Sequence, residues 1–188
     1  LYMNEKEFYK QLGNLTRNKD KWYNSIDYIG SLLTYPSLKI RAKVLWLLGE
    51  FGLKYPKEIT PYLDQIAELL NDKNAILRSR AINALGRIGR ADFIQIYPYW
   101  ERIMKMAKDE APNVRLYFIW ASENIATNTP QSYKDSMEIF CSLLDDVDDK
   151  VRMEAPEIFR VLAKHIPKLV NPYLEKLKVL SEHDNNRV

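Results

Sequence analysis

The chain has 188 residues, of which 46% are hydrophobic and 28% are charged, and its formal net charge is +3. This composition suits one folded water-soluble domain and excludes a low-complexity chain. The apolar runs are too short for a membrane-spanning helix, and a single cysteine, Cys141, excludes an internal disulfide. We therefore expect a cytoplasmic protein without a membrane-spanning segment.

The first 40 residues precede a regular pattern and resemble it only in part. Phe8, Leu12 and Leu15 recur at helical spacing, which predicts a helix near the amino end. Asn4 occupies the position that an arginine holds in each later unit. We interpret residues 1–40 as a divergent repeat region.

From residue 41 onward the sequence repeats with a period of 37 residues. The clearest marker is an arginine that recurs at this interval, at Arg41, Arg78, Arg115 and Arg152. A period of this length is typical of a solenoid, in which helix pairs stack on one another. We predict an all-α right-handed solenoid with four such units over residues 41–188, the last with an incomplete helix pair.

Capping residues predict two helices in each unit. The first helix of a pair should begin where a cap precedes a proline, at Thr60–Pro61 and Asn171–Pro172. The second helices should begin at a further set of caps, which are Ser37, Asn74, Ala111, Asp148 and Asn185. Pro156 falls inside the last second helix and should kink it, because proline lacks the backbone donor.

Two stretches of the chain carry a family resemblance. The segments NAILRSRAINALGRIG (74–89) and DDKVRMEAPEIFRVLA (148–163) begin at a capped turn, place an arginine in the first helical turn and carry small residues near their end. They resemble HEAT repeats, and the resemblance extends over nearly the whole chain. It implies antiparallel helix pairs whose second helices line a concave face. Tetratricopeptide units fit poorly because their period is about 34 residues, and armadillo units need a third helix.

The recurring arginines lie in the first turn of a helix, where the helix dipole disfavours a cation. Aspartates six residues earlier, Asp72, Asp109 and Asp146, can compensate and predict a structural Asp–Arg ladder between successive turns. The alternative is a row of ligand-binding arginines. Tyr35 stands where the first unit should have its aspartate, so Arg41 is the exception.

The concave face would expose one set of side chains from the second helices. Aromatic and arginine side chains are frequent binding anchors, and Tyr117 and Trp120 are close enough on one helix to form one platform. The alternative is that the tryptophans are packing wedges between repeats. We predict that an extended protein or peptide partner contacts Trp46, Arg80, Asn83, Arg87, Tyr117, Trp120 and Glu157.

Nucleic-acid binding and catalysis are the competing interpretations. The pairs Trp46/Glu50 and Trp120/Glu123 resemble the aromatic and carboxylate residues of HEAT-like DNA glycosylases of alkylation repair. Phosphate binding needs clustered positive charge, of which the second unit has a modest amount. The two histidines have no partner at metal-ligand spacing. We therefore predict a scaffold with no catalytic residue, cofactor or metal.

The carboxyl end predicts an uncovered surface. Residues 171–182 form a first helix without its second, which leaves Leu174, Leu177 and Leu180 without cover. Exposure of such a side chain forfeits roughly 1.5–3 kcal/mol. We expect that the chain is a fragment of a longer repeat protein, or that this end packs on another molecule, including a second copy.

Overall fold

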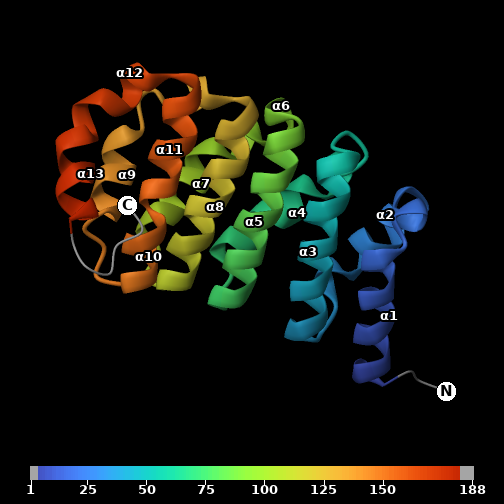
Figure 1. The fold of residues 1–188 in the computed structure, drawn as a ribbon. Coiled ribbons are helices and arrows are strands. Elements are labelled where there is room, and N and C mark those ends of the chain that lie inside the picture. Colours follow the sequence, from blue (N-terminus) through green and yellow to red (C-terminus); the bar gives the residue numbers. More distant parts are fainter. Residues whose placement is uncertain (1–3, 183–188) are drawn as a thin grey trace.

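The computed structural model describes residues 4–182, in which two layers of helices are stacked along one direction (Figure 1). The inner layer, drawn in front, holds α1 (Glu5–Arg17), α3 (Leu38–Lys54), α5 (Ala75–Ala91), α8 (Pro112–Asn128), α10 (Asp149–Glu154) and α11 (Pro156–His165). The outer layer holds α2 (Trp22–Ser31), α4 (Leu63–Glu68), α6 (Phe93–Ile96), α7 (Trp100–Lys105), α9 (Met137–Leu143), α12 (Pro167–Val170) and α13 (Leu174–Ser181).

Single 3-10 turns extend the outer helices and explain why these helices are short. They cover Lys19–Lys21, Leu32–Thr34, Thr60–Tyr62, Leu69–Asn71, Tyr97–Tyr99, Met106–Lys108, Pro130–Tyr133 and Asn171–Tyr173. Within residues 4–182 every regular element is helical, so the predicted all-α solenoid is confirmed. Residues 183–188, which end the last predicted unit and include the predicted cap Asn185, lie outside the described part. None of the described helices has the length and apolar character that crossing a membrane requires.

The inner helices begin where their caps predict. The side chain of Ser37 accepts a hydrogen bond from the amide of Ile40, and Asn74 accepts one from the amide of Ile76. At the start of α8 the cap is Ala111, and Pro112 takes the first helical position instead. These local signals therefore fix the start of each inner helix.

The predicted caps of the outer helices are wrong in detail. Thr60 and Asn171 are the first residues of 3-10 turns and make no side-chain cap bond. The Thr60 hydroxyl instead contacts Gln95 Oε1 at 2.7 Å, which joins two successive repeats. Pro61 is the second residue of the 3-10 turn Thr60–Tyr62, and α4 begins only after this turn, at Leu63.

Pro156 interrupts the last inner helix, as its missing donor predicts. The helix divides at Ala155 into α10 and α11, whereas α3, α5 and α8 each run unbroken for 17 residues. The inner layer is therefore regular through α8 and irregular after it.

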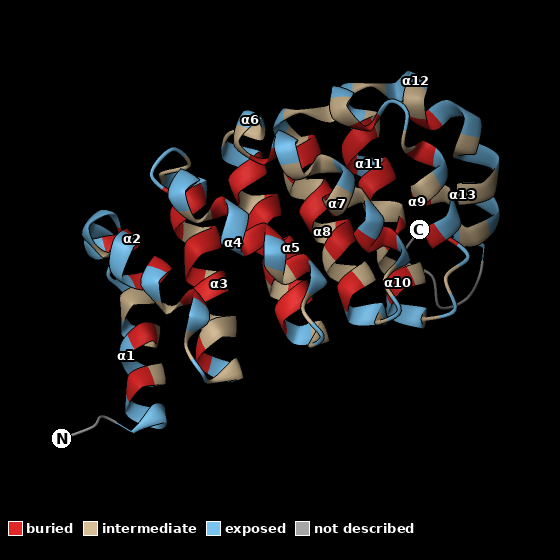
Figure 2. Cartoon of the chain, turned by 180° about the vertical axis from the view of Figure 1, so that it is seen from behind, coloured by how far each residue is buried: buried red, intermediate tan, exposed pale blue. Residues whose placement is uncertain are grey.

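The core lies between the two layers, and the buried residues form stripes on α3, α5 and α8 (Figure 2). Neighbouring inner helices approach closely at Gly86 in α5. A Cβ atom at this position would lie 2.5 Å from the Cα atom of Ala121 in α8, which is closer than real contacts allow. The glycine therefore sets the spacing between these two repeats.

Candidate binding face

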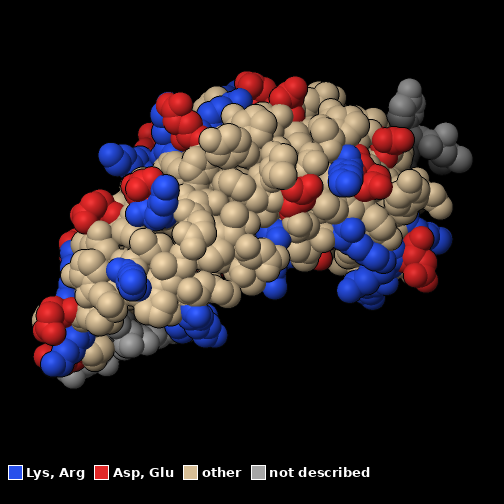
Figure 3. All heavy atoms as spheres, turned by 90° about the horizontal axis from the view of Figure 1, so that it is seen from above, with Lys and Arg blue, Asp and Glu red and all other residues tan. Residues whose placement is uncertain are grey.

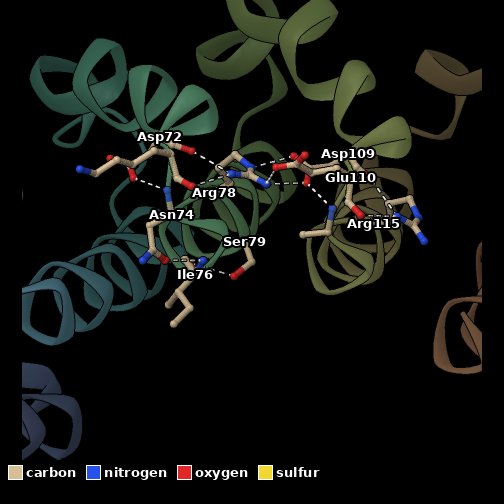
Figure 4. Close-up of polar contacts among 10 residues, drawn as sticks. Asp72, Asn74, Ile76, Arg78, Ser79, Asp109, Glu110 and Arg115 are labelled. Carbon is tan, nitrogen blue, oxygen red and sulfur yellow. Dashed lines mark hydrogen bonds and ion pairs between the residues drawn. The ribbon is translucent and has the colours of Figure 1, made fainter.

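The turns between paired helices hold the predicted Asp–Arg contacts in a different arrangement (Figure 4). Arg78 donates to the two carboxylate oxygens of Asp109, from Nε and from Nη2, at 2.8 Å each. Its Nη1 donates to the main-chain carbonyl of Asp72 at 2.9 Å. The guanidinium thus joins its own turn to the turn of the next repeat.

Arg115 repeats this geometry one unit further along. It donates to both carboxylate oxygens of Asp146 at 2.7 Å and to the carbonyl of Asp109 at 2.7 Å. Both ion pairs are shielded from solvent, since the side chains are 9% and 7% exposed in the Arg78–Asp109 pair and 11% and 8% exposed in the Arg115–Asp146 pair. Burial raises the pKa of the Asp146 carboxyl, but the hydrogen bond and the charge of Arg115 outweigh it and hold this pKa below its usual value.

We predicted that each arginine bonds to the carboxylate of the aspartate six residues before it, and this pairing is wrong. The carboxylate comes from 31 residues later, and the aspartate six residues earlier supplies only its carbonyl. The reason is local, because each aspartate carboxylate also accepts the amide two residues on, as Asp109 does from Ala111 at 2.9 Å. That turn points the carboxylate toward the preceding repeat.

The two outer members of the ladder are weaker. Arg41 approaches Asp72 at 3.8 Å, and no hydrogen bond joins their side chains in the described chain. Arg152 donates to the carbonyl of Asp146 at 2.6 Å, but its carboxylate partner is the neighbouring Asp149. The bidentate pairs are therefore those of the two central units.

A second set of bridges, which our sequence analysis did not find, joins the outer helices. Tyrosine hydroxyls donate to carboxylates of the preceding repeat: Tyr62 to Asp27 at 2.6 Å, Tyr99 to Asp64 at 2.5 Å and Tyr173 to Glu138 at 2.5 Å. The hydrogen bond to Asp27 raises the pKa of Tyr62 to about 12. These tyrosines share one position of the 37-residue period, and their recurrence was the sequence signal that could have predicted the bridges.

We call the solvent side of α3, α5, α8, α10 and α11 the inner face. Seen from above, the lower outline of the molecule is hollowed and Lys and Arg side chains project along it (Figure 3). This outline corresponds to the front of Figure 1.

The predicted aromatic residues lie on the inner face and are partly exposed. The rings of Tyr117 and Trp120 meet edge to face with centroids 4.9 Å apart, so they form one platform on α8. Trp46 lies on α3, where the ammonium group of Lys43 stands 4.3 Å from its ring centroid. The guanidinium of Arg80 stands 5.5 Å from the Tyr117 ring.

The remaining predicted contact residues are less available to a partner. Asn83 is 8% exposed and therefore largely covered. Arg87 is ion-paired with Glu50 of the preceding repeat, and Glu157 pairs with Arg160 at 2.6 Å. The structure thus brings the aromatic residues and Arg80 to the accessible surface, whereas the other three are covered or paired.

A hollow of about 400 Å³ opens on the inner face beside Trp46. It lies between three successive inner helices and is lined by Tyr9, Leu38, Lys39, Ala42, Lys43, Trp46, Ile76 and Arg80. Burial, and then the positive charge of Arg80, lower the pKa of Lys43. Sequence reasoning missed the contribution of Tyr9, because the divergent α1 did not show which side chains face α3.

Toward the carboxyl end the inner face carries charges of both signs, with Glu123 beside Arg160 and Lys164. Glu123 stands at the position that Gly86 occupies one repeat earlier, so its side chain lies against the next unit. Burial, with the charges of Glu154 and Glu157, raises the pKa of Glu123 to about 7. Its Oε1 is buried without a hydrogen-bond partner among the described residues. Residues 4–182 contain no group of three or more side chains suited to hold a metal ion.

Solved structures with a similar fold are repeat proteins. A designed armadillo repeat protein in complex with the peptide (KR)4 aligns with a TM-score of 0.64 and 20% identity, over 94% of this chain and 80% of that chain. An engineered protein aligns with a TM-score of 0.68 and 19% identity, over 98% and 88%. A Kap121p mutant aligns with a TM-score of 0.70 and 14% identity, over 89% of this chain and 18% of that chain. A search of curated proteins found no match.

The stacked helix pairs and these likenesses define a HEAT-like repeat protein. Residues 37–183 match the family described as "Sister chromatid cohesion protein PDS5 protein". This match spans most of the chain, and the chain therefore belongs to that family.

Proposed function

We propose that the chain is a non-catalytic scaffold that binds an extended protein or peptide partner along its inner face. The observation that carries this proposal is the accessible aromatic platform of Tyr117 and Trp120, with Trp46 on an earlier inner helix. Aromatic side chains bury large areas at low entropic cost and are enriched among binding anchors. The designed armadillo protein, which has a similar fold, binds a peptide, and this likeness supports the same use of the fold here.

The family description suggests where the partner should be sought. Sister chromatid cohesion is the process named for this family, and we infer that the partner is a protein component of that process. The cytoplasmic location expected from composition stays a prediction. Imaging of a tagged chain through the cell cycle would test this location and would show whether the chain meets chromatids, as a partner in cohesion requires.

The glycosylase-like alternative receives little support from the two tryptophan–carboxylate pairs. Glu50 is engaged by Arg87, so it is not free to act as a base beside Trp46. Glu123 lies near Glu154 and Glu157, and the Trp120 ring beside it meets Tyr117 edge to face. Because basic and acidic side chains alternate along the inner face, no continuous basic track is available to a phosphate backbone, and this favours a protein partner for the face as a whole.

Affinity capture from a lysate tests the proposal when three variants are compared. Trp120→Ala removes the platform on the inner face, Arg87→Glu breaks the pair with Glu50, and Tyr97→Ala alters an exposed ring of the outer layer as a matched control. We expect mass spectrometry to identify a protein that resists nuclease, persists with Tyr97→Ala and is lost with Trp120→Ala. Capture of nucleic acid alone, or equal capture by all variants, would contradict the scaffold.

Self-association through the carboxyl end stays a separate prediction. Leu174 and Val179 of α13 are 51% and 57% exposed, whereas Leu177 and Leu180 are partly covered. If this surface pairs with a second copy, sedimentation should show a dimer that Leu174→Lys dissociates. A monomer at every concentration would remove this proposal and leave the inner face unaffected.

A further inference from the structure

The amino-terminal half of the inner face holds three cations that find no carboxylate. Lys39, Lys43 and Arg80 line one hollow, and none of them forms an ion pair or a side-chain hydrogen bond within residues 4–182. By contrast, the arginines of the turns and of the outer helices bond to carboxylates, as Arg78 does to Asp109 and Arg102 to Glu68. Glu50, which lies outside the lining and pairs with Arg87, is the carboxylate whose charge acts on Lys43, and the hollow therefore keeps a net positive charge.

Each of these cations lies instead over an aromatic ring. Lys39 stands 4.4 Å from the centroid of Tyr9, and Lys43 and Arg80 stand over Trp46 and Tyr117. Such contacts hold the side chains in place and leave their donor groups free to face an anion. The rings also give the hollow apolar walls, which Leu38 and Ile76 extend.

The same lining excludes a basic occupant. No carboxylate lines the hollow, so a lysine or arginine side chain of a partner would enter a field of like charge. The designed armadillo relative binds the basic peptide (KR)4, and the charge of this hollow calls for the opposite chemistry.

We propose that this hollow binds an acidic segment of the partner, in which an apolar or aromatic side chain is flanked by glutamate or aspartate. The proposal rests on the function proposed above and specifies its partner. The apolar side chain enters between Trp46 and Ile76, and the flanking carboxylates accept hydrogen bonds from Lys39, Lys43 and Arg80. The volume of about 400 Å³ suits one large side chain with its neighbours.

A peptide suits this hollow better than a nucleic acid does. A bound single strand would carry one phosphate per nucleotide along an inner face on which the acidic Glu123 and Glu154 alternate with basic residues. A peptide can vary the sign of its charge from residue to residue and so match a face of mixed charge.

Fluorescence anisotropy with a defined probe tests this inference. The probe is a short labelled peptide in which one phenylalanine is flanked on both sides by glutamates. We expect binding that weakens as salt is added, and that is lost when the glutamates are replaced by glutamines or the phenylalanine by alanine. Equal binding of the glutamine peptide, or tighter binding of an oligo-thymidine strand of equal charge, would overturn the proposal.

Variants locate the binding on the protein. Lys43→Glu should weaken probe binding about tenfold or more, whereas Lys164→Glu, the same exchange at an exposed lysine of α11, should leave it unchanged. Lys43→Gln and Arg80→Gln give a milder pair of variants, and circular dichroism of each confirms that the solenoid is folded. Equal weakening by Lys164→Glu would show that only net charge matters and would overturn the site.

The two proposals fail in different ways. If the peptide probe does not bind but the lysate partner is still lost with Trp120→Ala, the scaffold stands and the acidic specificity is wrong. If the partner is also retained by the Trp120→Ala variant, both proposals are wrong.

Discussion

Arginine and tyrosine side chains in the turns and outer helices of this solenoid bond to neighbouring repeats, whereas the three cations in the amino-terminal hollow of the inner face form no such bond. Arg78 and Arg115 each bond to two turns, and Tyr62, Tyr99 and Tyr173 each bond to a carboxylate of the preceding repeat. Lys39, Lys43 and Arg80 rest only on aromatic rings. The difference separates side chains that hold the repeats together from side chains left for a partner.

The largest effect should come from breaking a central ladder contact. Asp109→Ala removes both short bonds to the buried Arg78 guanidinium and leaves it, as a carboxylate partner, only the exposed Glu110 at 3.5 Å, which we expect to cost about 3–5 kcal/mol. Asp72→Ala is the matched control, because both aspartates accept the amide two residues on, but Asp72 meets Arg41 only at 3.8 Å. In urea unfolding, the free energy of unfolding of Asp109→Ala should be well below that of Asp72→Ala. Equal losses would mean that only the hydrogen bond to the amide two residues on matters.

The next effect tests the close approach of the inner helices. Gly86→Ala places a methyl group against the backbone of Ala121 and should cost about 1–3 kcal/mol. Gly13→Ala in α1 meets no atom within 4 Å and should raise the free energy of unfolding by about 0.5–1 kcal/mol. The unfolding temperature should therefore fall in Gly86→Ala and rise in Gly13→Ala. A shift in the same direction in both variants would contradict the close packing of α5 against α8.

Glu123 gives a prediction that depends on pH. Its pKa is raised to about 7 from an ordinary 4.5, so the folded chain holds this proton over a pH window in which the unfolded chain has lost it. Stability from this group is present below pH 4.5 and is lost as pH rises through 7.

Glu123→Gln should therefore stabilise the chain at pH 8, by about 1 kcal/mol after allowance for solvent screening, and have no effect at pH 4. Glu58→Gln, an exchange at an exposed position, is the control and should change neither value. A gain at pH 4 equal to that at pH 8 would show that the raised pKa is not the cause.

A smaller effect belongs to the outer layer. Tyr99→Phe removes the hydrogen bond to Asp64 and should cost about 0.5–1.5 kcal/mol. Tyr97→Phe, two residues away and 64% exposed, should cost nothing measurable in the same denaturant titration. If both variants unfold at the same denaturant concentration, the tyrosine bridges do not hold the repeats.

The smallest effect on stability should accompany a clear loss of binding. Lys43→Gln removes a charge that forms no ion pair within residues 4–182, so its free energy of unfolding should stay within about 0.5 kcal/mol of the parent. Probe binding should nevertheless weaken. A stability loss comparable to that of Asp109→Ala would place Lys43 among the structural residues and break the comparison.

Local signals predicted the fold well, and contacts between repeats were harder to predict. The caps at Ser37 and Asn74 and the break at Pro156 act within a few residues, so the sequence showed them directly. The partner of Arg78 lies 31 residues away and depends on how the turns stack, which the pattern did not reveal.

The candidate site was predicted only in part for the same reason. The aromatic residues of the inner face followed from the repeat register. The hollow beside Trp46 also needs Tyr9 from the divergent α1, whose placement no column indicated. The covering of Asn83 and the pairing of Arg87 with Glu50 likewise depend on the neighbouring helix.

Hydroxyl-radical footprinting of the captured complex tests the central claim most directly, because aromatic side chains on both layers report in one experiment. We predict that the partner protects Trp46, Tyr117 and Trp120 from oxidation and leaves Tyr28 and Tyr97, which are exposed on the outer layer, as reactive as in the free chain. Protection of the outer tyrosines with unchanged oxidation of the inner aromatic residues would contradict the assignment of the inner face as the binding surface.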